Sequence, residues 1–158
     1  MIKQAALGRA RFAVLALVAL FAVSTFVPAA QAAKPKDGVY YQTFGTSGIG
    51  YVSTDGGKIT GATFATKWKN KQGKSCVPKG FQEDSNGYIN TYFETKGKVK
   101  SSGKFTVKNK KSPILPGLKA TVTGKFKTTK KARFKVVQKV GNCSSTRNFN
   151  KAVYTAGG

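Results

Sequence analysis

The stretch Gly103–Val140 reads GKFTVKNKKSPILPGLKATVTGKFKTTKKARFKVVQKV, and it decides which kind of fold this chain adopts. Apolar residues alternate along it with cationic or hydroxyl-bearing ones at a period close to two, which is typical of β-strands with one buried face. Gln138 interrupts the apolar row and Val137 the charged row. The apolar members of the three runs are Phe105 and Val107; Ala120, Val122, Gly124 and Phe126; and Ala132, Phe134, Val136 and Val140. The stretch therefore predicts a sheet with one apolar face and one lysine face.

The lysine face is the candidate binding surface. If residues 119–127 and 131–139 pair as a hairpin, cations lie opposite one another, at a cost of about 0.2–1 kcal/mol per pair that an anionic partner would relieve. Lysine outnumbers arginine, which favours diffuse charge attraction over bidentate phosphate recognition. The alternative is a solvated face that only keeps strands from aggregating. The candidate residues are Lys104, Lys108, Lys119, Lys125, Lys127, Lys131, Arg133, Lys135 and Lys139.

The charge is concentrated in the second half of the chain. The 158 residues include 28 Lys and Arg, 5 Asp and Glu and no His, for a net charge of +23. Residues 95–158 hold 17 basic residues and no acidic one, whereas residues 33–94 hold 8 basic and 5 acidic residues. This asymmetry bears on partners and solubility and leaves the choice of fold open.

The first 32 residues are typical of a secretory signal peptide. A basic start precedes an apolar run over residues 12–27, and the small-residue site Ala30-Gln31-Ala32 predicts cleavage after Ala32. The alternative is an uncleaved anchor, but the run is shorter than the ~20 residues that a spanning helix needs. We expect a secreted or cell-surface domain over residues 33–158. Its expected partners are an anionic polysaccharide, a teichoic acid or an anionic lipid surface; we expect no chromosomal nucleic acid and no cofactor.

The two cysteines, Cys76 and Cys143, predict a disulfide, because an even pair in an exported protein is usually bridged. The bridge would close a loop of nearly 70 residues. By reducing the entropy of the unfolded chain, closing a loop of this length stabilises the fold by roughly 4 kcal/mol. The alternatives are free thiols or half a metal site. A metal site would lack its usual partners because the chain has no histidine.

Short strands separated by turn signals account for the rest of the chain. We expect strands over residues 39–44, 49–54, 58–66 and 88–93, and a short last strand over 149–155. Residues 95–100 are expected either to extend the strand over 88–93 or to pair with it. Asp55-Gly56-Gly57 and Asn86-Gly87 are strong turn signals. No segment shows helical spacing with caps. The fold expected is all-β, a single antiparallel barrel or sandwich of about seven to nine short strands with mostly meander connections, preceded by the signal-peptide helix.

Evidence for an enzyme is weak. Without histidine there is no Ser-His-Asp or Cys-His arrangement. Glu83 and Asp84 could serve a calcium ion or act as a glycosidase acid, but solvated loop charges explain them more simply. Trp68 stands between lysines and could stack on a sugar or a base, or could cap the end of a barrel core, which we favour. A secreted enzyme or inhibitor using a loop near Trp68, Glu83 and Asp84 remains the alternative function.

The order of motifs resembles a group of small secreted bacterial β-domains of uncharacterised function. The pattern departs from the group at Ala132-Arg133-Phe134, where Gly-Thr-Phe is frequent, and at Phe149, where tryptophan is common. The resemblance implies a β-rich, disulfide-closed exported domain and transfers no catalytic residue. The motifs that carry it are Gly38-Val39-Tyr40, Thr46-Ser47-Gly48, Gly56-Gly57, Ala62-Thr63-Phe64, Cys76, Gly103-Lys104-Phe105, Val122-Thr123-Gly124-Lys125-Phe126, Cys143, Phe149 and Ala152.

Overall fold

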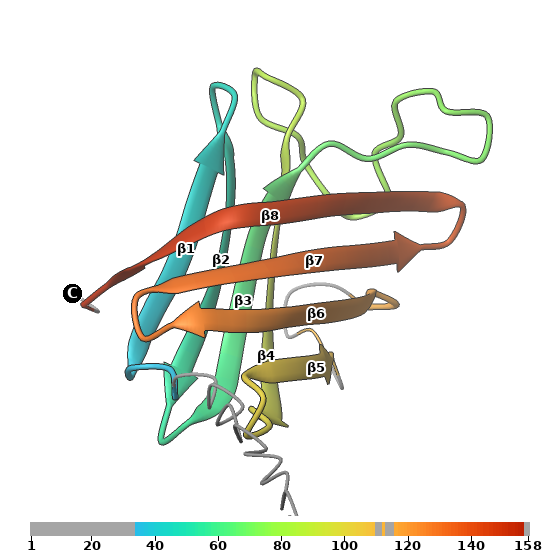
Figure 1. Cartoon of the computed structure of the whole chain (residues 1–158). Helices are drawn as coiled ribbons and strands as arrows, with labels where there is room; N and C mark the ends of the chain where they lie inside the picture. The colour runs from blue at the N-terminus through green and yellow to red at the C-terminus, as the bar shows by residue number, and fades with distance from the viewer. Residues whose placement is uncertain (1–33, 110–111, 113–115, 157–158) are drawn as a thin grey trace, which may run out of the picture.

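The computed structural model describes residues 34–109, 112 and 116–156, and this part of the chain is all-β (Figure 1). Eight antiparallel strands form a nearly closed barrel, as the alternating pattern predicts, and no helix occurs among the described residues. The expected signal-peptide helix lies outside them. The strands are β1 (Gly38–Phe44), β2 (Gly48–Asp55), β3 (Lys58–Thr66), β4 (Ile89–Lys98), β5 (Lys104–Lys108), β6 (Lys119–Thr128), β7 (Lys131–Val140) and β8 (Cys143–Thr155).

Two four-stranded meanders make up the sheet, whose order is β4-β3-β2-β1-β8-β7-β6-β5. In Figure 1 the β5–β8 meander lies in front of β1–β4, and its strands run crosswise to them. The meanders join where β1 pairs with the end of β8, through Val39–Tyr41 and Val153–Thr155. At the opposite edges side chains bridge β4 and β5: the Thr95 hydroxyl donates to the Lys108 carbonyl at 3.1 Å. The sheet therefore curls until its edge strands meet, which protects their backbones from pairing with other chains.

Aromatic rings fill the interior. Phe134 and Phe149 stack with ring centroids 4.8 Å apart, and Phe64 lies 5.6 Å from Phe149. Gly50 on β2 leaves the room that the Phe149 ring occupies, since a Cβ there would overlap it. The Tyr40 hydroxyl donates to the carbonyl of Thr129 at 2.7 Å, which satisfies the one polar atom of an otherwise buried ring. The inward row of each predicted run is thus a packed core.

Two predicted turns are confirmed in detail. Gly56 and Gly57 connect β2 to β3 with φ values of +54° and +72°. Positive φ at both central residues is what a two-residue hairpin loop of type I′ requires, and glycine adopts it without a steric penalty. Gly87, in the predicted Asn86-Gly87 turn, has φ of +75°.

The expected last strand was too short. β8 begins at Cys143 and runs to Thr155, whereas the sequence predicted only residues 149–155. The first half of β8 is polar and shows no apolar alternation, so its strand character comes from pairing with β7, as in Val137 opposite Thr146. β4 extends as far as Lys98, where it pairs with Lys58 on β3, which agrees with the expected extension over residues 95–100.

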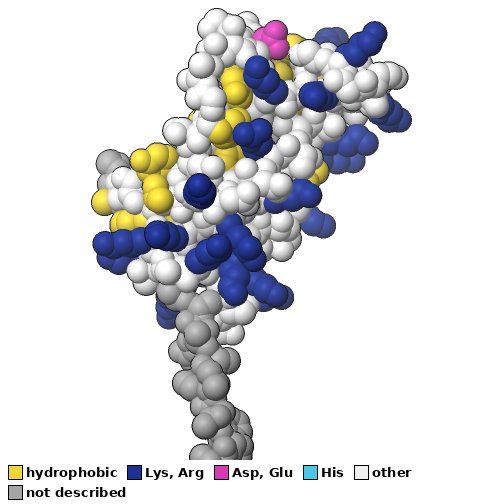
Figure 2. Space-filling view, turned by 45° about the horizontal axis from the view of Figure 1, so that its top comes forward, with side chains coloured by type: hydrophobic (Ala, Val, Ile, Leu, Met, Phe, Trp, Pro, Cys, Tyr) yellow, Lys and Arg dark blue, Asp and Glu magenta, His cyan; other side chains and the backbone are white. Residues whose placement is uncertain are grey.

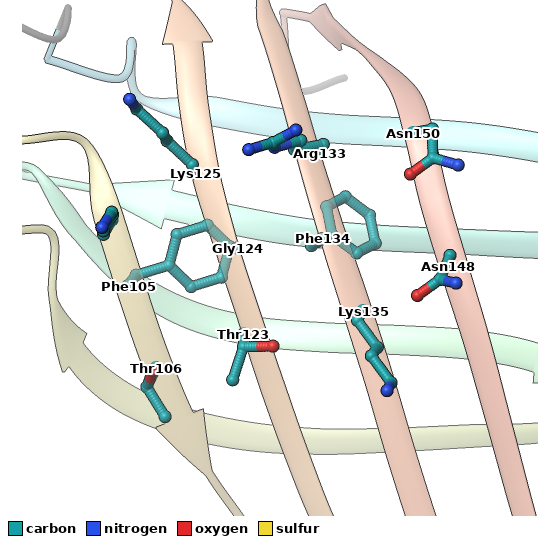
Figure 3. A pocket seen from close by; sticks show the side chains of 11 residues that line it. Phe105, Thr106, Thr123, Gly124, Lys125, Arg133, Phe134, Lys135, Asn148 and Asn150 are labelled. Atoms are coloured by element: carbon teal, nitrogen blue, oxygen red, sulfur yellow. The ribbon is translucent and has the colours of Figure 1, made fainter.

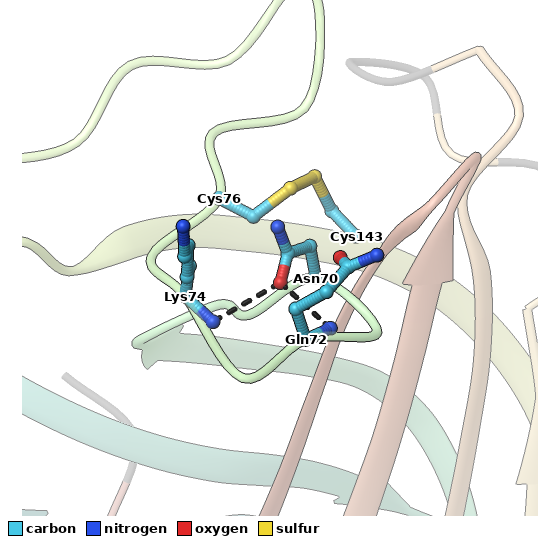
Figure 4. Close-up of a disulfide and its surroundings, with 5 residues drawn as sticks. All are labelled: Asn70, Gln72, Lys74, Cys76 and Cys143. Atoms are coloured by element: carbon cyan, nitrogen blue, oxygen red, sulfur yellow. Dashed lines mark hydrogen bonds between the residues drawn. A yellow bond between two sulfur atoms is a disulfide. The ribbon is translucent and has the colours of Figure 1, made fainter.

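The predicted disulfide is present. Cys76 and Cys143 lie with Cα atoms 5.7 Å apart and join the loop after β3 to the start of β8 (Figure 4). The loop is itself shaped by Asn70, whose side-chain carbonyl accepts the backbone N–H groups of Gln72 and Lys74 at 2.9 and 3.0 Å. The bridge therefore anchors a structured loop to the barrel.

Candidate polyanion interface

The predicted lysine face exists as a physical surface. Buried and exposed residues alternate strictly along β5 and β7, and the cations take the outward positions. Eight of the nine predicted cations are exposed, and Lys125 is half-buried. Figure 2 shows lysine and arginine side chains spread over the visible surface with little acidic colour among them. The chain has no acidic residue after Glu94, so no carboxylate of β5–β8 offsets this charge.

The strand register places three cations side by side. Lys104 on β5 is opposite Lys125 on β6, and Lys125 is opposite Arg133 on β7. Directly opposed residues on one sheet face have Cβ atoms about 4.5–5.5 Å apart. We call Lys104, Lys125 and Arg133 the cationic row. A parallel row beside it consists of Thr106, Thr123, Lys135 and Asn148.

A trough of about 490 Å³ lies over these two rows (Figure 3). Its floor is the backbone around Gly124, flanked by Phe105 and Phe134. A Cβ at Gly124 would overlap the Phe105 ring and lie 2.7 Å from the Arg133 carbonyl oxygen. Glycine at this position therefore leaves room for the Phe105 ring beneath the cationic row. Besides the cationic row the trough walls hold Thr106, Thr123, Lys135, Asn148 and Asn150.

The other five predicted cations lie beyond the trough. Lys119 is opposite Lys139 across β6 and β7, and Lys108 ends β5. Lys127 and Lys131 line a separate hollow of about 420 Å³. The cations thus extend along the outer surface on both sides of the cationic row and do not converge on one point.

The neutral polar residues of the trough were not among the residues predicted to form a binding surface. Thr106 and Thr123 lie in the outward rows that the alternation predicts. The sequence therefore predicted that they point outward, but not that they line the trough. Asn148 and Asn150 belong to β8, where the sequence predicted a shorter strand. Only the register of β8 against β7 brings Asn148 opposite Lys135.

The loop residues considered as an alternative site, Trp68, Glu83 and Asp84, make contacts that support the fold. Trp68 is 2% exposed and packs its ring 5.7 Å from Phe81, so it caps the core, as favoured, and presents no face to a ligand. Asp84 accepts the backbone N–H groups of Tyr88 and Asn86, both at 2.9 Å. The N–H of Tyr88 above all holds the pKa of Asp84 below its ordinary value. Glu83 is exposed and pairs through its backbone with Ile89.

No cluster of three or more potential metal ligands occurs within residues 34–109, 112 and 116–156. The described part of the chain also holds no helix with the length and hydropathy of a membrane span. Comparisons of the sequence with protein-family models and with curated proteins, and of the structure with solved structures, gave no match.

Proposed function

We propose that this chain is an exported, non-catalytic β-domain that associates with anionic polymers of the cell envelope or the extracellular space. The binding surface is the outward face of β5, β6 and β7. The partner is an anionic polysaccharide, a teichoic acid or an anionic lipid surface, and export through a cleaved signal peptide brings the domain to it. The disulfide supports this location, because such bridges persist in oxidising compartments.

The cationic row is the observation that carries the proposal. Lys104, Lys125 and Arg133 occupy directly opposed positions on three adjacent strands. Like charges in such positions repel, and each pair costs roughly 0.2–1 kcal/mol of stability. A partner that places negative charge over the trough converts this repulsion into attraction, whereas hydroxyl or amide side chains would serve solubility without that cost.

The shape of the surface favours a polymer over a small ligand. β6 and β7 each have 10 residues, and at about 3.3 Å per residue they extend roughly 30 Å. Cations line this length from Lys127 and Lys131 at one end to Lys119 and Lys139 at the other. An extended chain with repeated negative charges can contact many of them at once.

The test is the affinity for heparin and for purified teichoic acid, measured as a function of salt concentration. The triple variant Lys104→Gln, Lys125→Gln, Arg133→Gln removes the cationic row. At about 1 kcal/mol per basic residue at an anionic surface, we expect a loss of roughly a hundredfold in affinity. The matched control is Lys71→Gln, Lys74→Gln, Lys79→Gln, which removes the same charge from exposed positions in the loop after β3.

Two results would overturn the proposal. One is binding of the parent protein that does not weaken between low and high salt, since ionic attraction is screened within about 10 Å at 0.1 M. The other is an equal loss of affinity in the two triple variants, because total charge alone would then account for binding.

A further inference from the structure

The strands β1 and β8 separate at one end of the barrel and leave a second cavity. They are paired only between Val39–Tyr41 and Val153–Thr155, although β1 continues to Phe44 and β8 begins at Cys143. The cavity measures about 480 Å³, within the range of 300–1,000 Å³ that small-molecule sites occupy. Its lining combines the end of β1, the segment that follows β3, Tyr88 and the first residues of β8.

The cavity is cationic and is distinct from the trough. Arg147 is exposed, but it is opposite the buried Val136 of β7, whereas the trough residue Asn148 is opposite the outward Lys135. The Arg147 guanidinium lies over the Phe44 ring at 4.0 Å from its centroid. Lys67 and Lys69 supply two further charges. Contact with an aromatic ring restrains the guanidinium, and its planar set of N–H groups suits an oxyanion that accepts two hydrogen bonds.

Hydroxyl groups complete the lining. Thr66, Ser144, Ser145 and Thr146 line the cavity, and Ser145 shares the inward row of Arg147 on β8. Thr66 is 1% exposed, and its hydroxyl makes no hydrogen bond within the described part of the chain. A buried hydroxyl without a partner is costly, so its presence in the wall of a cavity points to a ligand that supplies one.

The wall is held in place by its neighbours. Lys69 and Ser144 exchange two backbone hydrogen bonds of 2.9 Å, directly beside the disulfide at Cys143. Lys67 lies 5.0 Å from the Tyr88 ring centroid and acts electrostatically on Asp84. Because Lys67 lies over the Tyr88 ring, we assign the contact with a ligand to Arg147 and Lys69.

We propose that this cavity binds a small organic oxyanion, a phosphate or a carboxylate carried on a sugar or similar polyol. The oxyanion lies against Arg147 and Lys69, and the ligand's hydroxyl groups exchange hydrogen bonds with the serine and threonine side chains. The cavity shares no lining residue with the trough, so this proposal does not depend on the polymer-binding function.

Calorimetric titrations with glucose 6-phosphate, glucuronic acid, inorganic phosphate and glucose test the proposal and separate the two oxyanions. We expect binding of glucose 6-phosphate, glucuronic acid or both, and none of glucose. Arg147→Gln should weaken this binding at least about tenfold, as expected for the loss of charge-assisted hydrogen bonds. Arg147→Lys should weaken it less.

Thr66→Val separates a ligand contact from a structural one. It replaces an unpartnered hydroxyl with a methyl group of the same shape, so the free protein should unfold at the same or a higher denaturant concentration. Its affinity for the sugar anion should nevertheless fall a few-fold. The variant Lys104→Gln, Lys125→Gln, Arg133→Gln should bind the small ligand like the parent protein, whatever happens to polymer binding.

Four results would each overturn the proposal: no binding of either sugar anion, unchanged binding in Arg147→Gln, inorganic phosphate binding as tightly as glucose 6-phosphate, or equal weakening in the cationic-row variant.

Discussion

At the residue scale, Gln138 shows how the core accommodates the residue that interrupts its apolar row. Its side chain is fully buried, and Nε2 donates to the Thr91 hydroxyl on β4 at 3.0 Å. The Thr91 hydroxyl in turn donates to the Phe64 carbonyl at 3.1 Å. The chain of hydrogen bonds joins β7, β4 and β3 across the barrel interior, so a polar residue contributes to closure of the barrel where an apolar one would only fill space.

This network predicts an asymmetric double-mutant cycle. Thr91→Val leaves the buried Gln138 amide without its partner and should lower the free energy of unfolding by about 1–3 kcal/mol. Gln138→Met should cost less, because Thr91 keeps its bond to the Phe64 carbonyl. The double variant should be nearly as stable as the parent, since both polar groups are then removed together. Urea denaturation of the four proteins measures the coupling.

Additive losses in the double variant would contradict this prediction. Such a result would mean that each side chain is satisfied separately and that the amide and the hydroxyl do not act as a pair.

At the element scale, the sequence predicted strands well wherever one face is apolar. The bounds expected for β3 are those observed, and those for β1, β2, β6 and β7 agree to within one residue. β8 was missed over Cys143–Asn148 because its inward residues there include Ser145 and Arg147, so no alternating pattern marks it. Pairing with β7 makes it a strand, and that information lies in a different part of the chain.

The two candidate sites also differ in how far the sequence predicts them. The cationic row was predictable because alternation places Lys104, Lys125 and Arg133 outward on successive strands. The second cavity was not, since Phe44, Thr66 and Arg147 come from three elements with unrelated patterns. They meet only because β1 and β8 separate after three paired residues, and no local sequence signal specifies where two distant strands cease to pair.

The disulfide predicts a local effect as well as a global one. Replacing both Cys76 and Cys143 by alanine should lower the free energy of unfolding by about 2–4 kcal/mol, because the bridge restricts a long loop in the unfolded chain. In the folded state the paired Lys69 and Ser144 amides lie next to the bridge and should exchange their hydrogens faster. Hydrogen exchange under native conditions measures this effect.

Amides in the centres of β6 and β7 serve as the internal control. They should change only by the amount that global destabilisation allows. Equal acceleration at all positions would show that the bridge acts on the unfolded chain alone and leaves the loop no more mobile.

At the scale of the whole molecule, the fold gathers a large part of the positive charge on one region of the surface. Residues 33–158 carry a net charge of +20, and the outward faces of three neighbouring strands hold nine of the cations. A net charge this far from zero destabilises the compact state through self-repulsion, while it keeps the protein soluble. The barrel tolerates this because its aromatic interior and its disulfide do not depend on the charged face.

Self-repulsion predicts that salt stabilises this protein. Raising NaCl from about 0.01 to 0.5 M shortens the screening length from about 30 Å to only a few ångströms, so the unfolding temperature should rise. The variant Lys104→Gln, Lys125→Gln, Arg133→Gln should be more stable than the parent at low salt and should gain less from added salt, because its closest cation pairs are gone. Lys71→Gln, Lys74→Gln, Lys79→Gln has the same net charge and should keep most of the salt dependence. If the two variants respond to salt alike, the repulsion is spread over the whole surface. Repulsion within the cationic row would then no longer support the proposal of an anionic partner.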